Sequence, residues 1–181
     1  MPADMEIICV TPANYSKHFQ VMEMTRTYRQ EHLWSVEYLT SPVEEYRQTD
    51  REKTTFVAVT RIKEFIGKFP SLPIALKFIS PLTFPAGMTQ WDSTLGRVRQ
   101  VIVDEKYRGQ GVATKLVRLV FKEAKKEGKS SVLVHALGQS TLFYRKLGFT
   151  ELGQPYLSGD KGVTCQKMVA SMEVEVECPE I

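Results

Sequence analysis

The sequence predicts an α/β fold in which short β-strands alternate with amphipathic helices. Three observations lead to this prediction. Short runs rich in β-branched and apolar residues recur along the chain, as expected for strands. The segment after residue 112 repeats apolar residues at helical spacing. A glycine-spaced loop joins one of the strands directly to that helix, which is a usual connection in α/β folds.

The composition is that of a globular chain. With 181 residues, 43% hydrophobic and 25% charged, the chain is long enough to bury a substantial core. We therefore expect a single domain over residues 1–181, with a loose acidic tail at 170–181. The net charge of +3 is too small to predict a nucleic-acid partner. No stretch approaches the ~20 apolar residues of a membrane span, so no membrane partner is expected.

The cysteines and the N-terminal residues bear on the cellular compartment. Cys9, Cys165 and Cys178 are odd in number and widely spaced, which favours reduced thiols over a disulfide framework. Residues 1–6 lack the basic region and apolar run of a signal peptide. We expect a cytoplasmic protein and leave a nuclear location open.

The N-terminal half predicts two strands with helical segments between them. Residues 6–10 form a short apolar run, and residues 54–60 alternate cleanly, so both are expected to be strands. The intervening residues predict two short helices, interrupted by a Ser-Pro pair. Four prolines divide the apolar runs between 62 and 92, where only 74–79 reads as a strand. Because proline cannot donate to a β-ladder, the rest is expected to form loops or an edge strand.

The C-terminal half has the clearest periodicity. Residues 97–103 predict a strand that leads into the glycine loop. The helix after the loop has one continuous apolar face, carries lysines near its end and stops at Gly128. The remaining elements expected are a strand over 131–136, a short helix over 139–147 and a strand over 163–169.

The loop over residues 108–113 has the properties of an anion-binding turn. Backbone N–H groups converge at a helix N-terminus, where the helix dipole adds partial positive charge. Glycine lets an anion approach the backbone closely. The loop is not a P-loop, because it lacks the Gly-Lys-Ser/Thr ending, and it is not the GxGxxG dinucleotide motif. Taken alone, two glycines before a helix most often form a simple tight strand-to-helix turn.

A second motif, Phe143-Tyr144-Arg145-Lys146-Leu147-Gly148-Phe149, follows one helix and one strand later. Together the two motifs resemble the GNAT superfamily of acetyl-CoA-dependent N-acyltransferases. The pyrophosphate loop of this family, Arg/Gln-x-x-Gly-x-Gly/Ala, is matched by Arg108, Gly111 and Ala113. Its aromatic-Tyr block with a Lys-Leu-Gly-Phe ending is matched by residues 143–149. The resemblance covers residues 96–169 by motif and the N-terminal half only by element order.

The resemblance implies a GNAT fold of the α+β type, with a twisted mixed β-sheet of about six to seven strands flanked by helices on both faces. It implies transfer of an acetyl or other short acyl group from acetyl-CoA, a co-substrate, to a primary amine by direct attack on the thioester. It implies no metal. The acceptor stays open between a small molecule and a lysine side chain or N-terminus of a protein, and a homodimer is also left open.

The resemblance also assigns residues to the cofactor. Main-chain groups of Val101, Ile102 and Val103 would contact the pantetheine arm and the thioester oxygen. The second motif would contribute Phe143 and Lys146. The loop and the first helical turn would bind the pyrophosphate through Arg108, Gly109, Gln110, Gly111, Val112, Ala113 and Thr114.

Tyr144 lies where the family commonly places its general acid. A phenol with a pKa near 10 suits protonation of a thiolate of similar basicity. The alternative is a packing aromatic. Many relatives carry a glutamate base where this chain has Arg99, and arginine cannot accept a proton at neutral pH. A catalytically weak CoA-binding module of the same fold is therefore the alternative function.

The general base is left open between a water chain, a carboxylate elsewhere and an amine that arrives neutral. His135 is a candidate by its pKa, with a strand-end histidine bonded to backbone as the other interpretation. The aromatic-rich residues 15–46 and the segment containing Trp91 are expected to shape the acceptor site, unless they only pack the core. Cys165 is interpreted as a buried thiol rather than a nucleophile.

Overall fold

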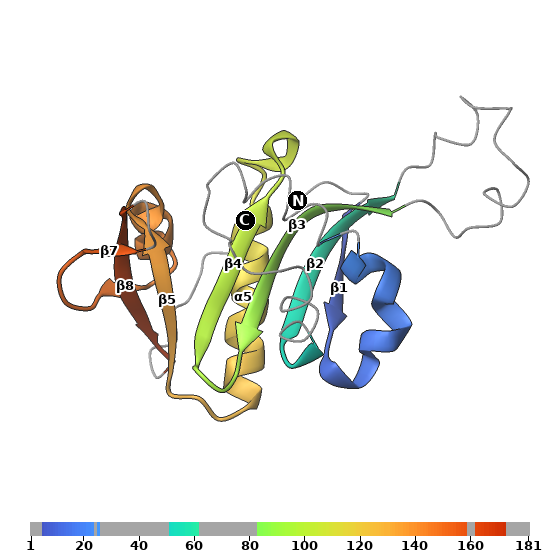
Figure 1. The fold of residues 1–181 in the computed structure, drawn as a ribbon, viewed down its shortest axis with the longest axis horizontal. Helices are drawn as coiled ribbons and strands as arrows, with labels where there is room; N and C mark the ends of the chain where they lie inside the picture. Colours follow the sequence, from blue (N-terminus) through green and yellow to red (C-terminus); the bar gives the residue numbers. More distant parts are fainter. Residues whose placement is uncertain (1–4, 24, 26–50, 62–82, 159–161, 173–181) are drawn as a thin grey trace, which may run out of the picture.

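The computed structural model describes residues 5–23, 25, 51–61, 83–158 and 162–172. These residues form an eight-stranded mixed sheet in the order β1-β2-β3-β4-β5-β8-β6, with β7 also paired to β8 (Figure 1). Within it, β4 and β5 are parallel and the other neighbours are antiparallel. The strands are β1 (Met5–Val10), β2 (Thr54–Arg61), β3 (Thr83–Asp92), β4 (Arg97–Val103), β5 (Ser131–Leu137), β6 (Thr150–Glu151), β7 (Tyr156–Ser158) and β8 (Val163–Ser171).

In the part of the chain that the structure describes, α5, α6 and three short 3₁₀ helices accompany the sheet, and residues 19–23 after η1 are α-helical as well. Helix α5 follows β4 and precedes β5 in the sequence, and it packs along one face of the sheet (Figure 1). Lysines in its last turn complement the helix dipole, as the sequence predicted. The helices are η1 (Pro12–His18), η2 (Glu105–Tyr107), α5 (Val112–Lys126), η3 (Gly138–Ser140) and α6 (Thr141–Lys146).

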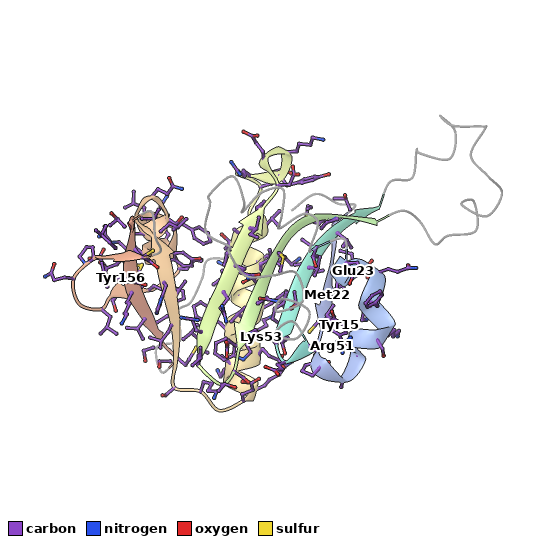
Figure 2. All side chains as sticks on the ribbon, viewed as in Figure 1. Tyr15, Met22, Glu23, Arg51, Lys53 and Tyr156 are labelled. Atoms are coloured by element: carbon purple, nitrogen blue, oxygen red, sulfur yellow. The ribbon has the colours of Figure 1, made fainter. Side chains whose placement is uncertain are left out.

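The alternation along β2 shows that both faces of the sheet are covered. Phe56 and Ala58 belong to the core cluster that contains the apolar face of α5. Val57 belongs to a second cluster with Tyr15 and Met22, which come from the segment after β1 (Figure 2). Successive side chains of a strand point to opposite faces, so the two clusters lie on opposite sides of the sheet. The predicted mixed sheet with helices on both faces is therefore confirmed.

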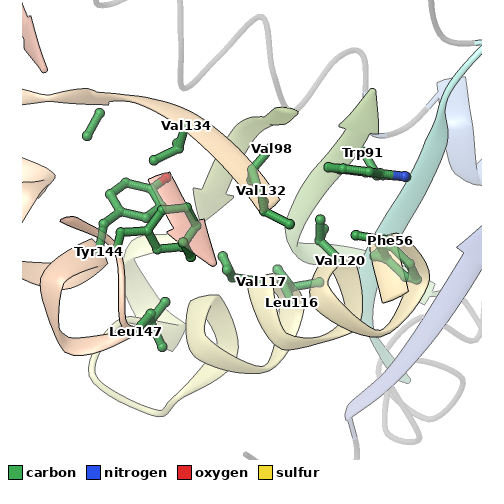
Figure 3. Close-up of a cluster of buried hydrophobic side chains, with 14 of the residues drawn as sticks. Phe56, Trp91, Val98, Leu116, Val117, Val120, Val132, Val134, Tyr144 and Leu147 are labelled. Atoms are coloured by element: carbon green, nitrogen blue, oxygen red, sulfur yellow. The ribbon is translucent and has the colours of Figure 1, made fainter. Parts of the chain in front are cut away.

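The main core lies between α5 and the sheet. Leu116, Val117 and Val120 of the helix are fully buried and pack with side chains of β4 and β5, including Val98 and Val132 (Figure 3). Burying an aliphatic side chain of this size contributes about 1.5–3 kcal/mol. This packing fixes the N-terminal end of α5 against the sheet, next to the end of β4.

Strand β3 corrects the expectation of loops or an edge strand before residue 92. It lies between β2 and β4, in the interior of the sheet. The register with β2 shifts between Ala58 and Val59, where Pro85 pairs with Val59. A β-bulge interrupts the ladder, which is the setting in which an interior strand tolerates proline. The strand expected at 74–79 lies outside the described residues.

The other predicted strands are confirmed, and their ends agree within two residues. The short helix expected at 139–147 is observed as η3 followed by α6. The small strands β6 and β7 were not predicted. Cys9 and Cys165 are free thiols, whereas Cys178 and residues 173–181 of the expected tail lie outside the described residues. Within the described part of the chain, no helix is both long enough and apolar enough to span a membrane.

Candidate active site

The parallel seam between β4 and β5 pairs over a short length only. Arg97 is opposite Leu133 and Val98 is opposite Val134, and the register ends there. Beyond these pairs the two strands diverge (Figure 1). The edge of β4 that faces β5 therefore has no β5 partner over Val101–Val103. Unpaired main-chain groups on such an edge can bind an extended ligand in the manner of an added strand.

A β-bulge lies on β4 where the seam opens. Two residues of β4, Gln100 and Val101, oppose the single residue Thr89 of β3, because the register shifts between Met88 and Gln90. Gln100 has a φ of 52°, in the left-handed region that non-glycine residues rarely adopt. A bulge of this kind re-aims the side chains that follow it and often lies next to an active site.

The predicted loop begins after η2 and ends at the N-terminus of α5. Gly109 and Gly111 have φ angles of 75° and 78°, and a Cβ added at either glycine meets no atom within 4 Å. The first helical hydrogen bond that follows runs from Lys115 N to Gly111 O, at 3.0 Å. The N–H groups of Val112, Ala113 and Thr114 thus have no intrahelical partner, and Gly111 has no side chain to cap them.

Open space, free N–H donors and the positive end of a helix dipole meet at this point. These are the requirements of an anion-binding site at a helix N-terminus. The loop therefore fits a pyrophosphate bound by main-chain groups. A side chain at Gly111 would enter the space that an anion would take.

Side chains within and before the loop stabilise it through hydrogen bonds to the protein backbone. The Nε of Arg108 donates to Val103 O at 3.2 Å, and the Nε2 of Gln110 donates to Lys106 O at 2.8 Å. The Oδ1 of Asp104 accepts from Lys106 N at 2.9 Å. Both polar side chains of the motif are thus engaged with the protein, which leaves the backbone as the part suited to a ligand.

Tyr144 of the second motif is buried on the α5 side of the sheet. Its ring packs edge-to-face on Phe143 and Phe149, with centroids 4.9 and 5.4 Å away. It lies beside Val134, the last β5 residue paired to β4 (Figure 3). Burial raises the pKa of the phenol well above its usual value, so Tyr144 stays protonated at neutral pH.

The structure brings most, but not all, of the predicted cofactor residues together. Val101–Val103, the loop 108–111 and the first turn of α5 follow one another along the chain with only η2 between the strand and the loop. Tyr144 lies beside the seam between β4 and β5. Phe143 is half-buried against the core. Lys146 is exposed in the last turn of α6, and no described contact joins it to the loop.

Arg99, at the position of the expected glutamate, is half-buried and lies near a carboxylate. Its Nη1 is 3.4 Å from Asp92 Oδ2, and the Nζ of Lys53 is 4.0 Å from the same oxygen. The other oxygen of Asp92 accepts from Leu95 N at 3.1 Å. This buried carboxylate therefore has three partners within the protein.

His135 differs from its expected setting. Its Nδ1 is 2.9 Å from the hydroxyl of Tyr156, so its partner is a side chain rather than the backbone. Burial lowers the pKa of the imidazole. The charges of Arg97, Lys167 and Arg99 lower that pKa further. His135 is therefore neutral at pH 7. The partner Tyr156 lies on β7, which no sequence pattern indicated.

Trp91 corrects one expectation about the acceptor site. Its side chain is fully buried in the α5 core, and its Nε1 donates to Glu127 Oε2 at 2.9 Å. Tyr15, from the aromatic-rich segment 15–46, is buried as well, and most of that segment lies outside the described residues. Cys165 is buried, and burial raises the pKa of its thiol, which agrees with an unreactive role.

No metal site is visible in the part of the chain that the structure describes, where no three His, Cys, Asp or Glu side chains gather. The loop at the start of α5 and the seam beside Tyr144 are the features arranged for a ligand.

Comparisons with known proteins identify the family and the fold. A family model described as an acetyltransferase (GNAT) domain matches residues 83–172. No curated protein matches the chain in sequence. Among solved structures, a provisionally named N-acetyltransferase from Lactobacillus plantarum is 17% identical with a TM-score of 0.64, over 93% of this chain and 98% of that one.

Two further structures have the same fold. An acyl-CoA N-acyltransferase from Pseudomonas aeruginosa is 14% identical with a TM-score of 0.61, over 92% of this chain and 99% of that one. A chain of the NatC complex bound to Gag peptide and CoA is 14% identical with a TM-score of 0.58, over 93% and 98%. At these identities the likeness shows the fold.

The family model covers the bulged strand β4, the glycine loop, α5 and the Tyr144 motif. The sequence motifs and the geometry agree with it independently. The chain belongs to the GNAT acetyltransferases, a family of acyltransferases.

Proposed function

We propose that the protein transfers an acetyl or other short acyl group from acetyl-CoA to a primary amine. One observation carries this proposal: the uncapped N-terminus of α5 and the open edge of β4 adjoin each other. An anion-binding loop beside an unpaired strand edge suits a molecule with a pyrophosphate and an extended amide-bearing arm, as CoA has.

The proposed placement of CoA follows from these two features. The pyrophosphate would lie against the backbone of Arg108–Thr114, and the pantetheine arm would run along Val101–Val103. The bulge at Gln100 would aim main-chain groups at the thioester oxygen, where charge develops during acyl transfer. The NatC complex, a chain of which shares the fold, was solved bound to CoA, which supports CoA as the ligand.

The chemistry needs one bond made and one broken. The amine nitrogen attacks the thioester carbonyl carbon, so that a C–N bond forms and the C–S bond breaks. The protonated phenol of Tyr144 would donate its proton to the departing thiolate. The proton lost by the amine passes to solvent, directly or through the neutral imidazole of His135.

Isothermal titration tests the donor. We expect acetyl-CoA to bind with one site per chain and ATP not to bind, because the loop lacks the P-loop lysine and hydroxyl. Binding of ATP alone would contradict the proposal. A titration that shows acetyl-CoA bound, with no amine acetylated in a broad panel, would instead support a CoA-binding module, the alternative that Arg99 in place of a glutamate permits.

A further inference from the structure

A row of polar side chains crosses the sheet on the face away from α5. Thr55 of β2 is opposite Gln90 of β3, and Gln90 is opposite Arg99 of β4. His135 of β5 is opposite Lys167 of β8. Arg99 and His135 each follow one residue of the last pair in the parallel seam, where β4 and β5 begin to diverge, and the charge of Arg99 still acts on His135. Directly opposed residues share a face, so the row extends over β2, β3 and β4 on one side of the seam and over β5 and β8 on the other.

This row lies on the other face from Tyr144. Val98 and Val134, the paired residues that precede Arg99 and His135, point into the α5 core with Tyr144. Successive residues alternate between faces, so Arg99 and His135 point the other way. On β4, the row residue Arg99 directly precedes the bulge at Gln100 and Val101. A molecule bound on the row would therefore lie beside the strand edge proposed for the thioester.

Positive charge accumulates along this row. Arg97 lies two residues before Arg99 on the same face of β4, and Lys167 lies across β5 from them. The Nζ of Lys167 is 5.8 Å from the ring centroid of Tyr156. Among the described residues, Asp92 is the one carboxylate paired with these cations, and it already pairs with Arg99 and Lys53. The row therefore carries more positive than negative charge.

The guanidinium of Arg97 has one unsatisfied donor. Its Nε is buried and has no hydrogen-bond partner in the described structure. A buried N–H donor without an acceptor is costly, and such groups in native proteins usually indicate a missing ligand or water. Burial and the charge of Arg99 lower the pKa of Arg97, and the same cations lower the pKa of His135. Asp92 is opposite Arg97 in the β3–β4 register, but its carboxylate is also paired with Arg99 and Lys53, so one negative charge faces three cations.

We propose that the acceptor amine also carries an anionic group, a carboxylate or a phosphate, and that Arg97 and Arg99 bind this group while the amine reaches the β4–β5 seam. The planar guanidinium offers two parallel N–H donors to such a group. Lys167 adds a third positive charge at the far side of the seam. This inference rests on the proposed acetyl transfer and names the class of its acceptor.

The test compares matched acceptors in an acetyl-transfer assay. One arm pairs an amino acid with its carboxamide, and the other pairs phosphoethanolamine with ethanolamine. We expect R97Q to raise KM for the anionic member of the preferred pair about tenfold or more, because a charge-assisted hydrogen bond is lost. The neutral member should change less than twofold. Comparison of the two arms shows which anion the site takes.

Three further measurements make the result specific. R118Q removes an exposed arginine of α5 and should leave both KM values unchanged. R97K keeps the charge but loses the planar fork, and should recover part of the affinity. Acetyl-CoA titration and thermal unfolding of each variant show whether the donor site and the fold are intact.

An unchanged KM for anionic acceptors in a folded R97Q variant would overturn this inference and leave acetyl transfer standing. Equal use of charged and neutral acceptors by the unaltered protein would do the same. Failure of every amine in both arms, with acetyl-CoA bound, would overturn the proposed function and this inference with it.

Discussion

The hydroxyl of Thr89 on β3 donates to the carbonyl oxygen of Arg99 on β4, at 3.1 Å, where β4 carries its bulge. Thr89 is fully buried, and it is the single β3 residue that faces the two bulged residues. This bond joins the irregular part of β4 to a regular interior strand. The bulge in turn sets which side chains of β4 point toward α5 and which point to the opposite face of the sheet, where the row of polar side chains lies.

T89V should therefore destabilise the protein. Valine has nearly the same shape as threonine but removes the donor from the Arg99 carbonyl, so we expect a loss of about 1–3 kcal/mol. The midpoint of urea unfolding measures it. T164V, at an exposed position of β8, is the matched control and should change stability by less than about 0.5 kcal/mol. Equal midpoints for T89V and the unaltered protein would show that the bond does not support the bulge.

G111V should weaken acetyl-CoA binding. The φ of 78° disfavours a branched side chain by about 1–2 kcal/mol, and that side chain would occupy the anion's space. G128V is a matched control, because Gly128 has a φ of 70°, also faces open space and lies past the other end of α5. Both variants should lose stability, but only G111V should lose affinity in a titration. Equal affinities of G111V and G128V for acetyl-CoA would show that the loop is not part of the acetyl-CoA site.

Y144F should lower kcat at least tenfold while the dissociation constant for acetyl-CoA stays nearly the same. The hydroxyl is the only group removed, and phenylalanine can keep the edge-to-face contacts with Phe143 and Phe149. Thermal unfolding should show no loss of stability, because no described residue bonds to this hydroxyl. Steady-state kinetics at saturating acetyl-CoA gives the result. An unchanged kcat would remove Tyr144 from the mechanism.

R97Q should raise the pKa of His135. The pKa is lowered first by burial and then by the charges of Arg97, Lys167 and Arg99, which disfavour the imidazolium. Removal of one cation reduces this repulsion, so the imidazole should gain its proton at a higher pH, closer to 6.5. NMR titration of the ring protons measures the change. R118Q should leave the pKa of His135 unaltered. A titration curve of R97Q identical to that of the unaltered protein would show that Arg97 is too far from His135 to affect its pKa.

The parts of the fold that could be predicted from sequence are local. Helix α5 follows from its own apolar periodicity and its Gly128 stop, and the loop follows from Gly109 and Gly111 directly after a strand. Strand β3 could not be predicted in the same way. Pro85 argues against an interior strand until the register with β2 shows the bulge that accommodates it.

The candidate site divides along the same line. The donor residues lie in two continuous motifs, so their arrangement could be expected from the chain alone. The row of polar side chains depends on the registers of β2, β3, β4, β5 and β8. These registers bring Gln90, Arg99, His135 and Lys167, which are far apart in the sequence, to one face of the sheet. The pairing of His135 with Tyr156 has the same origin, since it joins β5 to β7 across 21 positions of the chain.

Acetyl transfer is the central claim, and the most direct measurement is the stoichiometry of thiol and product. The protein is mixed with acetyl-CoA and a primary amine that carries a carboxylate or a phosphate, and free thiol and acetylated amine are quantified together. We predict thiol release that depends on the amine, with one acetylated amine formed for each thiol. Thiol release at the same rate without amine, or no release while acetyl-CoA saturates the protein, would contradict acetyl transfer.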